Sequence, residues 1–364
     1  MRSKLFRNLT VIIPTIGNIY YDDILYFILE CLLKLKIKII IVSNFKLKKN
    51  IETSNLKIII TNKKNAYEKI HLALYHVKTR DVFFQRDDVC IHTAGFIKIY
   101  KEFKKNLKLS SCQGIKLIVD KFNTNRFYLH NPYVYDYYNN FLKKQNIINK
   151  IKYSLSHGPE CLWTFHRSKF IKKFYQLTSK KYFLDPYILY EYYVIFFLYI
   201  YGDIRWAKYP ISLQIKFRED KNTYKSYNEV FLDQSLIKLI DKNLNKIAEM
   251  FSNIRGGKLK ERIATIKKIM EESLQIRLKN PKPKDLIYSN YLYLVINLFK
   301  KYTIKMYYNL FKKSNVPFPN DIYFKSFIKK SNFYHLYFNK NFRQDYKICI
   351  DVLNNIISKL NNKS

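Results

Sequence analysis

The sequence predicts an α/β protein with a Rossmann-like, mostly parallel central sheet flanked by helices, followed by an α-helical C-terminal extension. Three observations predict this class. Short apolar, β-branched runs alternate with segments of helical spacing over roughly the first 220 residues, as in doubly wound sheets. Polar residues follow the ends of these runs. After about residue 225 the alternation stops, and we therefore divide the chain into domains 1–222 and 223–364.

The predicted strands of the first half are short apolar runs, several of them rich in isoleucine. The run at 9–15 ends in Pro-Thr, which suits a buried parallel strand. The remaining elements of this half are strands at 37–42, 56–61 and 81–84, and helices at 22–35, 66–77 and 95–106. Because strands and helices alternate, we expect the strands to be parallel.

Beyond residue 106 the pattern is less regular. We predict strands at 109–119 and 161–167, a buried helix at 187–201, and a short pair of strands within 204–215. Residues 120–155 are rich in Tyr and Asn and indicate no particular element. Lysine-rich amphipathic helices are expected at 229–251 and 259–278, with further helices within 286–364.

The net charge of the chain is +38, from 66 Lys and Arg residues against 28 Asp and Glu residues. Such a field attracts polyanions: nucleic acid, anionic lipid headgroups or phosphorylated substrates. Codon bias is another source of the lysines, because Lys, Ile, Asn, Tyr and Phe are all abundant, but it explains the shortage of acids less well. A hydrophobic content of 48% excludes a disordered protein.

Segments typical of exported or membrane-spanning proteins are not apparent. Asn8, Thr10 and Pro14 interrupt the first apolar stretch, which argues against a signal peptide. No run reaches the roughly 20 apolar residues that span a membrane. The five cysteines form no CxxC pair and predict neither a disulfide framework nor a zinc site. We expect a cytoplasmic protein, with or without peripheral attachment to the inner face of the cell membrane.

Polar residues at the predicted strand ends are the candidate binding groups, because ligands of open parallel sheets bind beyond the carboxyl ends of the strands. They are Pro14-Thr15, Ser43-Asn44, Asn62 and Arg86-Asp87-Asp88. The adjacent carboxylates Asp87 and Asp88 are hard oxygen ligands that suit Mg²⁺ or Mn²⁺, and such an ion would neutralise a leaving diphosphate. The alternative is an Asp-Asp turn that caps the helix beginning near Thr93.

The order of these motifs resembles family 2 glycosyltransferases with the glycosyltransferase A fold. Members open with a strand ending in Pro-Thr or Pro-Ser, carry an acidic residue or Asn after the second strand, and a DxD or DDD motif after the fourth. The matching segments are Pro14-Thr15, Ser43-Asn44, Arg86-Asp87-Asp88, Gln113-Gly114, Phe165-His166-Arg167, residues 184–191 and Gly202-Asp203-Ile204. The resemblance covers about residues 9–219 and is to a bacterial branch with a DDD-type motif.

The resemblance implies a nucleotide-sugar pocket at the strand ends. Pro14 and Thr15 would line the pocket, and Asn44 would bond the base or the ribose. Other residues implied to lie near the nucleotide are Asn62, Asn65 and Lys69. The alternative for Asn44 is an Asx-turn that has no contact with a ligand.

The resemblance also implies the reacting groups. Asp87 would be the main ligand of Mn²⁺ or Mg²⁺, and Asp88 would contact the metal or the donor sugar. A DxD alignment places Gln85, and a DDD alignment places Arg86, where the motif has its first carboxylate. Either metal binding is weaker for this reason, or Arg86 bonds the diphosphate directly and partly replaces the cation. Glu191 or Asp185 would be the general base on the acceptor hydroxyl, in a single displacement that inverts the anomeric carbon.

Both candidate bases have a structural alternative. Glu191 lies among aromatic residues on a predicted helix and could be a core acid paired with Arg205 or Arg218. Asp185 precedes a proline and could be only a helix N-cap.

The expected activity is transfer of a sugar from a nucleoside-diphosphate sugar to a glycan or lipid-linked acceptor, in surface polysaccharide or lipopolysaccharide synthesis. One alternative is a basic nucleic-acid-binding protein that stacks bases on its aromatic residues, although no recognised nucleic-acid motif appears. Another is a degenerate, non-catalytic transferase-like protein. The Lys- and Tyr-rich C-terminal part would form either a patch for an anionic membrane surface or a solvated helical cap.

Overall fold

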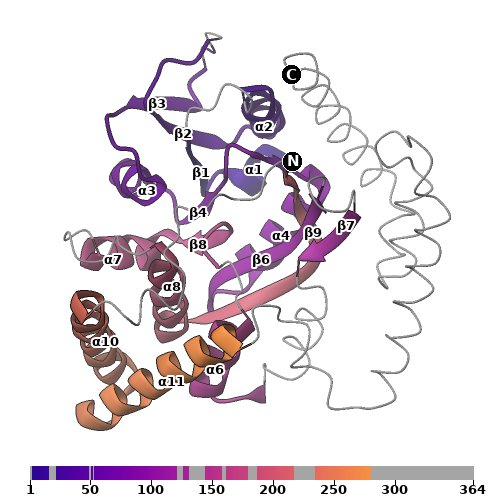
Figure 1. The fold of residues 1–364 in the computed structure, drawn as a ribbon. Helices are drawn as coiled ribbons and strands as arrows, with labels where there is room; N and C mark the ends of the chain where they lie inside the picture. Colours follow the sequence, from indigo (N-terminus) through magenta and orange to yellow (C-terminus); the bar gives the residue numbers. More distant parts are fainter. Residues whose placement is uncertain are drawn as a thin grey trace, which may run out of the picture.

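A mixed sheet with helices packed on both of its faces forms the centre of the computed structural model of this chain (Figure 1). The structure describes residues 2–15, 22–48, 51, 53–120, 126–130, 144–157, 161–178, 187–216 and 234–279. In this part of the chain nine strands join the sheet in the order β3-β2-β1-β4-β8-β6-β9-β5, and β7 pairs with β6. The predicted α/β class is confirmed.

The first four strands form the parallel half of the sheet. They are β1 (Leu9–Pro14), β2 (Lys38–Ser43), β3 (Leu56–Ile60) and β4 (Asp81–Phe84). β1 pairs in parallel with both β2 and β4, and β2 pairs in parallel with β3. Every residue of β1 is buried, and a strand covered on both faces needs the continuous apolar run that the sequence has there.

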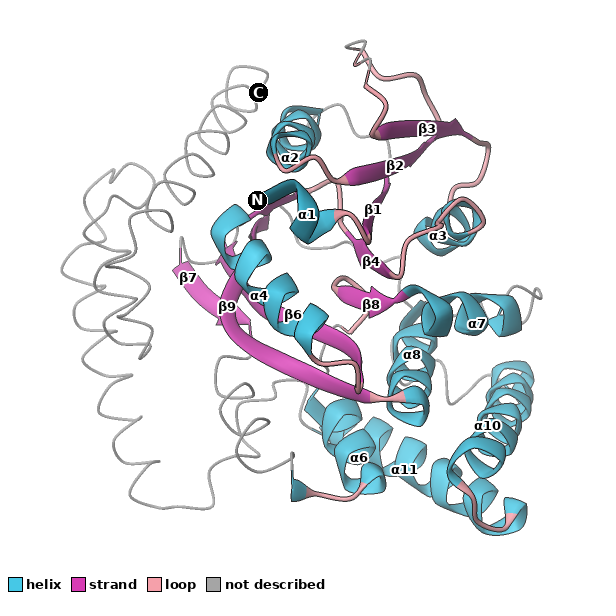
Figure 2. Ribbon diagram, turned by 180° about the vertical axis from the view of Figure 1, so that it is seen from behind, coloured by secondary structure: helices cyan, strands magenta, loops and turns pink. Residues whose placement is uncertain are grey.

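Helices α2 (Asp22–Lys34) and α3 (Ala66–Leu74) lie on opposite sides of these strands (Figures 1 and 2). The chain moves outward from β1 through β2 to β3 and then returns through α3 to β4 on the other side of β1. The direction of winding therefore reverses between β1 and β4. Crevices at such reversals are where open α/β sheets bind ligands.

The second half of the sheet is mixed. β8 (Phe165–Arg167) pairs antiparallel with β4 and with β6 (Leu109–Asp120), and so joins the two halves. β9 (Asp203–Lys216) runs parallel to β6. Antiparallel pairs add β5 (Val89–Ile91) to β9 and β7 (Arg126–His130) to β6.

The predicted pair of short strands within 204–215 is wrong, because this segment forms one long strand, β9. β9 follows β6 through register shifts near Gln113 and Ile115 instead of turning back. Gly114 allows the close approach there, since a Cβ at this position would lie 2.8 Å from both the Ile211 side chain and the Tyr209 carbonyl oxygen. A bulge has taken the place of the expected turn.

Seven further helices surround the sheet in the described residues. They are α1 (Arg2–Phe6), α4 (Thr93–Lys105), α6 (Ile147–His157), α7 (Ser168–Thr178), α8 (Tyr187–Tyr201), α10 (Gln234–Arg255) and α11 (Leu259–Lys279). No described helix combines the length and the apolar character needed to cross a membrane. α10 and α11 correspond to the two predicted lysine-rich helices.

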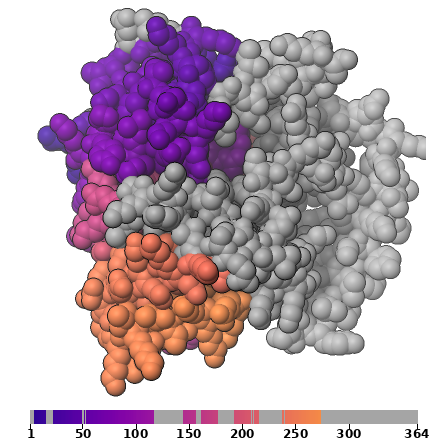
Figure 3. Space-filling model, turned by 60° about the vertical axis from the view of Figure 1, so that its left-hand side comes forward, coloured from indigo at the N-terminus to yellow at the C-terminus, as the bar shows by residue number. Residues whose placement is uncertain are grey.

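Helices α10 and α11 pack against α8 and α6, respectively, and lie at the end of the described molecule away from β1–β3 (Figures 2 and 3). The Arg255 guanidinium donates to the carbonyl oxygens of Ile200 (2.8 Å) and Tyr199 (3.2 Å), which satisfies acceptors at the C-terminal end of α8. Lys152 on α6 pairs with Glu272 on α11 at 2.5 Å. The predicted boundary at 222/223 lies outside the described residues and stays a prediction.

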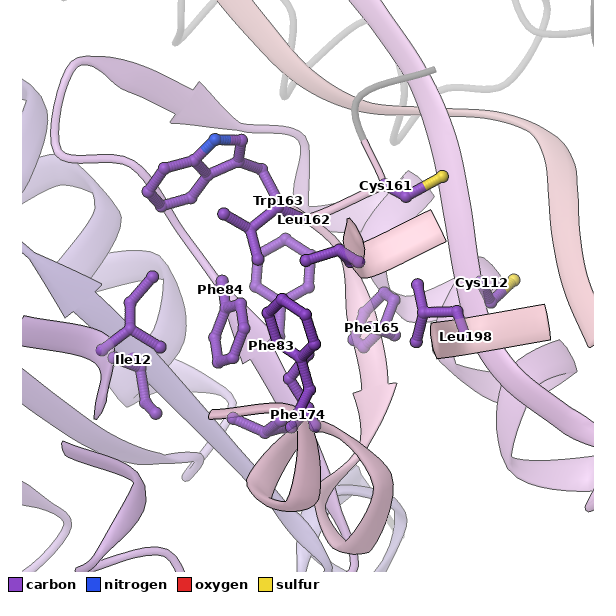
Figure 4. Close-up of a cluster of buried hydrophobic side chains, with 14 of the residues drawn as sticks. Ile12, Phe83, Phe84, Cys112, Cys161, Leu162, Trp163, Phe165, Phe174 and Leu198 are labelled. Carbon is purple, nitrogen blue, oxygen red and sulfur yellow. The ribbon is translucent and has the colours of Figure 1, made fainter. Parts of the chain in front are cut away.

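An aromatic cluster joins the two halves of the sheet (Figure 4). Phe165 of β8 lies 4.6 Å from Phe83 of β4, measured between ring centroids, and 4.8 Å from Phe96 of α4. Tyr100 and Phe103 of α4 complete the cluster around Phe165. Because these rings come from β4, β8 and α4, their packing fixes the antiparallel strand β8 against the parallel half.

A buried ion pair lies beside this cluster. Arg167 of β8 donates to Asp81 of β4 at 2.6 Å, and both side chains are almost fully buried. Three further guanidinium hydrogens donate to the carbonyl oxygens of Leu109 (3.2 Å), Phe103 (2.7 Å) and Asn106 (2.7 Å). The Tyr100 hydroxyl donates to Asp81 at 3.1 Å, and burial together with the Asp81 charge raises the pKa of Tyr100.

We predict that Arg167→Met destabilises the protein by about 3 kcal/mol, because the buried Asp81 carboxylate loses its buried counter-charge and keeps only the partly exposed Arg80, whose guanidinium lies 3.3 Å away. Urea denaturation measures the effect. Arg205→Met is the matched control: Arg205 pairs with Glu102 at 3.0 Å, but its side chain is 44% exposed, and the expected loss is below about 1 kcal/mol. Equal losses in the two variants would contradict the special role of the buried pair.

His166, in the middle of β8, is fully buried between β4 and β6. Its Nε2 lies 2.7 Å from the carbonyl oxygen of Leu162, and its ring packs against Phe84. Burial lowers the pKa of His166 to about 4, so the imidazole is neutral in the folded protein at neutral pH.

Stability should therefore depend on pH through His166. In the unfolded chain its pKa is about 6.5, so between pH 6.5 and 4 the unfolded state binds one more proton than the folded state. The contribution of neutral, buried His166 to the free energy of unfolding is fully present above pH 6.5. It is lost as the pH falls from 6.5 toward 4, at up to about 1.4 kcal/mol per pH unit. Urea denaturation from pH 4 to 7 should show a shallower slope for His166→Gln, and parallel profiles would refute the assignment.

Candidate functional site

The carboxyl ends of β1 and β2 are joined directly by hydrogen bonds. The Thr15 amide, just after β1, donates to the Val42 carbonyl oxygen at 2.9 Å, and its hydroxyl donates to the Ser43 hydroxyl at 3.1 Å. Both Thr15 and Ser43 are buried. These bonds hold the carboxyl ends of β1 and β2 together, at the edge of the sheet where the sequence places the candidate binding groups.

The side chain of Lys69, on α3, extends to this edge and connects the residue after β1 with the residue after β2. Its side chain is buried, and the Lys69 residue is only 1% exposed. Its ammonium donates to the Thr15 carbonyl oxygen and to Asn44 Oδ1, both at 2.5 Å. Burial lowers the pKa of Lys69, and the nearby Asp87 carboxylate opposes this by raising it. Lys69 therefore lies among residues that follow β1, β2 and β4.

Asn44 uses both of its amide hydrogens within the protein. They bind the carbonyl oxygens of Thr61 (2.7 Å) and Lys63 (2.8 Å), while Oδ1 accepts from Lys69. Asn44 thus ties the end of β2 to the loop between β3 and α3. A bond from Asn44 to a base or ribose would have to use the remaining lone pair of Oδ1.

The two other asparagines predicted near a nucleotide lie on the same loop. Asn65 is the N-cap of α3, and its side-chain oxygen accepts from the Tyr67 amide at 2.8 Å. Asn62 is exposed and lies between Thr61 and Lys63, whose carbonyl oxygens bind Asn44. The structure therefore gives Asn65 a capping role and leaves Asn62 at the surface of the edge.

A turn follows β4 and carries Arg86, Asp87 and Asp88. The buried side-chain amide of Gln85 donates through Nε2 to the carbonyl oxygens of Arg86 (2.8 Å) and Val89 (2.7 Å) and so closes the turn. Sequence reasoning treated Gln85 only as a missing acid. A buried polar residue directly after an apolar strand is the signal that indicates its structural role.

Arg86 and Asp88 form a bidentate ion pair across this turn. Arg86 Nε donates to Asp88 Oδ1 at 2.8 Å, and Nη2 donates to Oδ2 at 2.6 Å. The side chains are 30% and 15% exposed. The alternative that these acids cap the next helix is wrong, because strand β5 intervenes and His92 caps α4 by accepting from the Gly95 amide at 3.1 Å.

The fit of a divalent ion to this turn depends on Asp88. Both of its oxygens accept hydrogen bonds from Arg86, and Lys69 lies near Asp87, so the four charged groups sum to zero. A neutral set attracts a free cation weakly. Asp87 and Asp88 carry the hard carboxylate oxygens that Mg²⁺ or Mn²⁺ prefers, but both oxygens of Asp88 are occupied by Arg86 in this arrangement. Within the described residues no group of three or more His, Cys, Asp or Glu residues could hold a metal.

The candidate general bases are not tested by the structure. Glu191 lies in the first turns of α8, but its side chain is outside the described part, and Asp185 lies entirely outside it. Arg205, one of the two arginines considered as a structural partner of Glu191, pairs with Glu102 at 3.0 Å. Arg218 lies outside the described residues.

The fold and the strand edge define an α/β protein with a candidate anion-binding site at the reversal between β1 and β4. No protein-family model matches the chain, and no curated protein matches it. Among solved structures the chain is similar to residues 1–349 of TarS from S. aureus, with 14% identity, a TM-score of 0.45, and coverage of 78% of this chain and 75% of TarS 1–349.

Two further solved structures are similar at the same level or lower. The structure of TarS 1–349 in complex with UDP-GlcNAc has 14% identity and a TM-score of 0.46, covering 75% of this chain and 73% of that one. The 2-C-methyl-D-erythritol 4-phosphate cytidylyltransferase of Francisella tularensis has 11% identity and a TM-score of 0.34, covering 62% and 98%. Similarities this distant assign no activity, so function is argued from the site.

We predict that Lys69→Met destabilises the protein by about 3 kcal/mol, since it removes two charge-assisted hydrogen bonds and leaves Asp87 buried beside an apolar group. Lys63→Met is the control, because Lys63 forms an exposed ion pair with Glu68 and should contribute below about 1 kcal/mol. Adding Asp87→Asn to Lys69→Met should recover part of the loss in urea denaturation. Additive losses would show that Lys69 and Asp87 do not interact.

Proposed function

We propose that the chain is a glycosyltransferase that moves a sugar from a nucleoside-diphosphate sugar to a glycan or lipid-linked acceptor. The observation that carries this proposal is the Lys69 ammonium, which joins Thr15 and Asn44 beside Asp87 at the reversal of the sheet. Open α/β sheets bind ligands at such a point. The order of strand-end motifs, which resembles that of family 2 glycosyltransferases, supports the same reading.

The donor would lie along the strand edge in this proposal. Pro14 and Thr15 would line the nucleotide pocket, with Asn44, Asn62 and Asn65 on its far side. The guanidinium of Arg86 matches the geometry of phosphate oxygens, which it can bind in a bidentate manner. Arg86 would therefore hold the diphosphate, and Lys69 would hold Thr15 and Asn44 in place.

The proposed reaction is a single displacement at the anomeric carbon. A carboxylate, Glu191 or Asp185, takes the proton of the acceptor hydroxyl as its oxygen forms the new glycosidic bond. The bond to the diphosphate breaks on the opposite face, so the configuration inverts, and the nucleoside diphosphate leaves with its negative charge next to Arg86. Mn²⁺ or Mg²⁺, held by Asp87 and Asp88 when bound, supplies further charge stabilisation.

The proposed location is the cytoplasmic face of the cell membrane, in surface polysaccharide or lipopolysaccharide synthesis. The net charge of +38 supports attraction to anionic lipids. The same charge would also attract nucleic acid, so nucleic-acid binding is a second candidate function. The first experiment below distinguishes it from sugar transfer.

The first experiment is a thermal-shift screen with UDP, GDP and CDP, each with and without Mn²⁺, beside an oligonucleotide. A shift with one nucleotide supports the transferase. A shift with the oligonucleotide alone, lost at high salt, would instead support a nucleic-acid-binding protein.

We predict that Asp87→Asn lowers donor turnover by about 10²–10³-fold, a range typical for removal of an electrostatic group at a reaction centre. The variant keeps the size of the side chain but removes the carboxylate next to the buried Lys69 ammonium, so turnover is compared per folded protein, with the folded fraction measured by urea denaturation. The assay follows release of the nucleoside diphosphate from the donor that the screen identifies. Asp241→Asn, in an ion pair with Lys267 on the helical face, is the control and should leave turnover unchanged. Full turnover by Asp87→Asn would rule out the proposed site.

A further inference from the structure

We propose that the Arg86–Asp88 ion pair is a latch, in which the donor diphosphate takes Arg86 away from Asp88 and so makes Asp88 available to a divalent cation. The inference rests on the proposed function. It makes nucleotide and metal binding mutually dependent and assigns that dependence to one pair of side chains.

Among four charged groups that the structure describes at the edge, two positive and two negative, the charges sum to zero. Asp88 is paired with Arg86, and Asp87 lies near the ammonium of Lys69, so two carboxylates meet two cations. A divalent ion gains little from a site of zero net charge. A bound sugar-nucleotide diphosphate adds about two negative charges, one for each phosphate, and a divalent ion would then restore neutrality. Charge alone therefore favours binding of the two together.

The geometry identifies Asp88 as the group that changes partner. Its two carboxylate oxygens each accept one hydrogen bond from Arg86, at 2.8 and 2.6 Å. The guanidinium fork binds two phosphate oxygens in the same manner as two carboxylate oxygens. A diphosphate can thus replace Asp88 as the partner of Arg86 without a change in the kind of bond. Asp87 does not offer this exchange, because its neighbour Lys69 is buried and already binds Thr15 and Asn44.

The pair is weak enough to open. It lies on a turn, between residues two apart, and both side chains reach solvent. Its bidentate geometry makes it stronger than the ~1 kcal/mol of an ordinary exposed pair, while its partial exposure keeps it weaker than the about 3–5 kcal/mol at stake in a buried pair. In contrast, the Arg167–Asp81 pair is buried and could not exchange partners without a large loss. The fold therefore places an exchangeable pair at the ligand edge and a fixed pair at the other end of β4.

Thermodynamic linkage makes the coupling reciprocal: if the nucleotide strengthens metal binding, the metal strengthens nucleotide binding by the same factor. In the wild type, Mn²⁺ alone should bind weakly. Arg86→Gln should bind Mn²⁺ alone at least about tenfold more tightly, because Asp88 is released, and this factor corresponds to about 1.4 kcal/mol. Titration followed by the paramagnetic resonance signal of free Mn²⁺ measures this directly and needs no catalysis.

A double-mutant cycle separates the latch from simple charge removal. If Arg86→Gln acts by releasing Asp88, it should give no gain in Mn²⁺ affinity in the Asp88→Asn background. A gain of the same size in that background would show that only the positive charge of Arg86 matters, and the latch would be refuted. Equal Mn²⁺ affinity of Arg86→Gln and the wild type would refute it as well.

Repeating the Mn²⁺ titration in the presence of the nucleoside diphosphate tests the latch and the proposed function separately. The nucleoside diphosphate from the thermal-shift screen should strengthen Mn²⁺ binding to the wild type at least tenfold, and clearly less in Arg86→Gln. If a nucleotide binds but the coupling is the same in both proteins, the latch fails and the transferase stands. If none of UDP, GDP and CDP binds with or without Mn²⁺, the proposed function fails.

Discussion

The buried pair of Asp81 and Arg167 is the interaction on which the rest of the architecture depends. Two charges taken out of water are tolerated only where every hydrogen-bonding group is satisfied. Arg167 comes close to this condition, because four of its five N–H groups donate to the Asp81 carboxylate and to three backbone carbonyl oxygens, and the Phe103 ring centroid lies 3.9 Å from its guanidinium carbon. The pair joins the start of β4 to β8, α4 and β6. A shift of β4 or β8 would break the buried ion pair, and a shift of α4 or β6 would remove carbonyl acceptors from the buried guanidinium.

This constraint also reaches the candidate site, because β4 carries the pair at its first residue and the acidic turn directly after its last. Only residues 82–84 separate the fixed end from Gln85. With one end of β4 held by Arg167 and its register held by β1, the turn has little freedom to move relative to Thr15. A site that must meet a diphosphate with fixed charges benefits from being built on such a rigid strand.

The parallel half of the fold could be predicted from the sequence, because its strands are buried on both faces and therefore appear as plain apolar runs. The mixed half could not. β8 has only three residues, and its position between β4 and β6 depends on the Arg167 network and on the ring of Phe165, which are contacts between residues far apart in the chain. β9 looked like two strands because a bulge opposite Gly114 bends it without interrupting it.

The candidate site was predictable to the same extent. That Thr15, Asn44 and Lys69 lie together follows from parallel strands ending at one edge, which the motif order indicates. That the Asn44 amide is already used, and that Asn65 caps a helix, depends on the path of the loop between β3 and α3. No spacing rule predicts a loop path, since it is set by which carbonyl oxygens remain to be satisfied.

The balance of charge at the strand edge matters because the whole chain is so basic. With 66 Lys and Arg residues against 28 Asp and Glu residues, an unpaired arginine in a crevice would bind any polyanion that the field attracts. Pairing Arg86 with Asp88 removes that general affinity and leaves a specific one, since a ligand must present two oxygens in the right geometry to displace the carboxylate. In the proposed latch, the long-range charge would raise the local concentration of anions, and the Arg86–Asp88 pair would select among them.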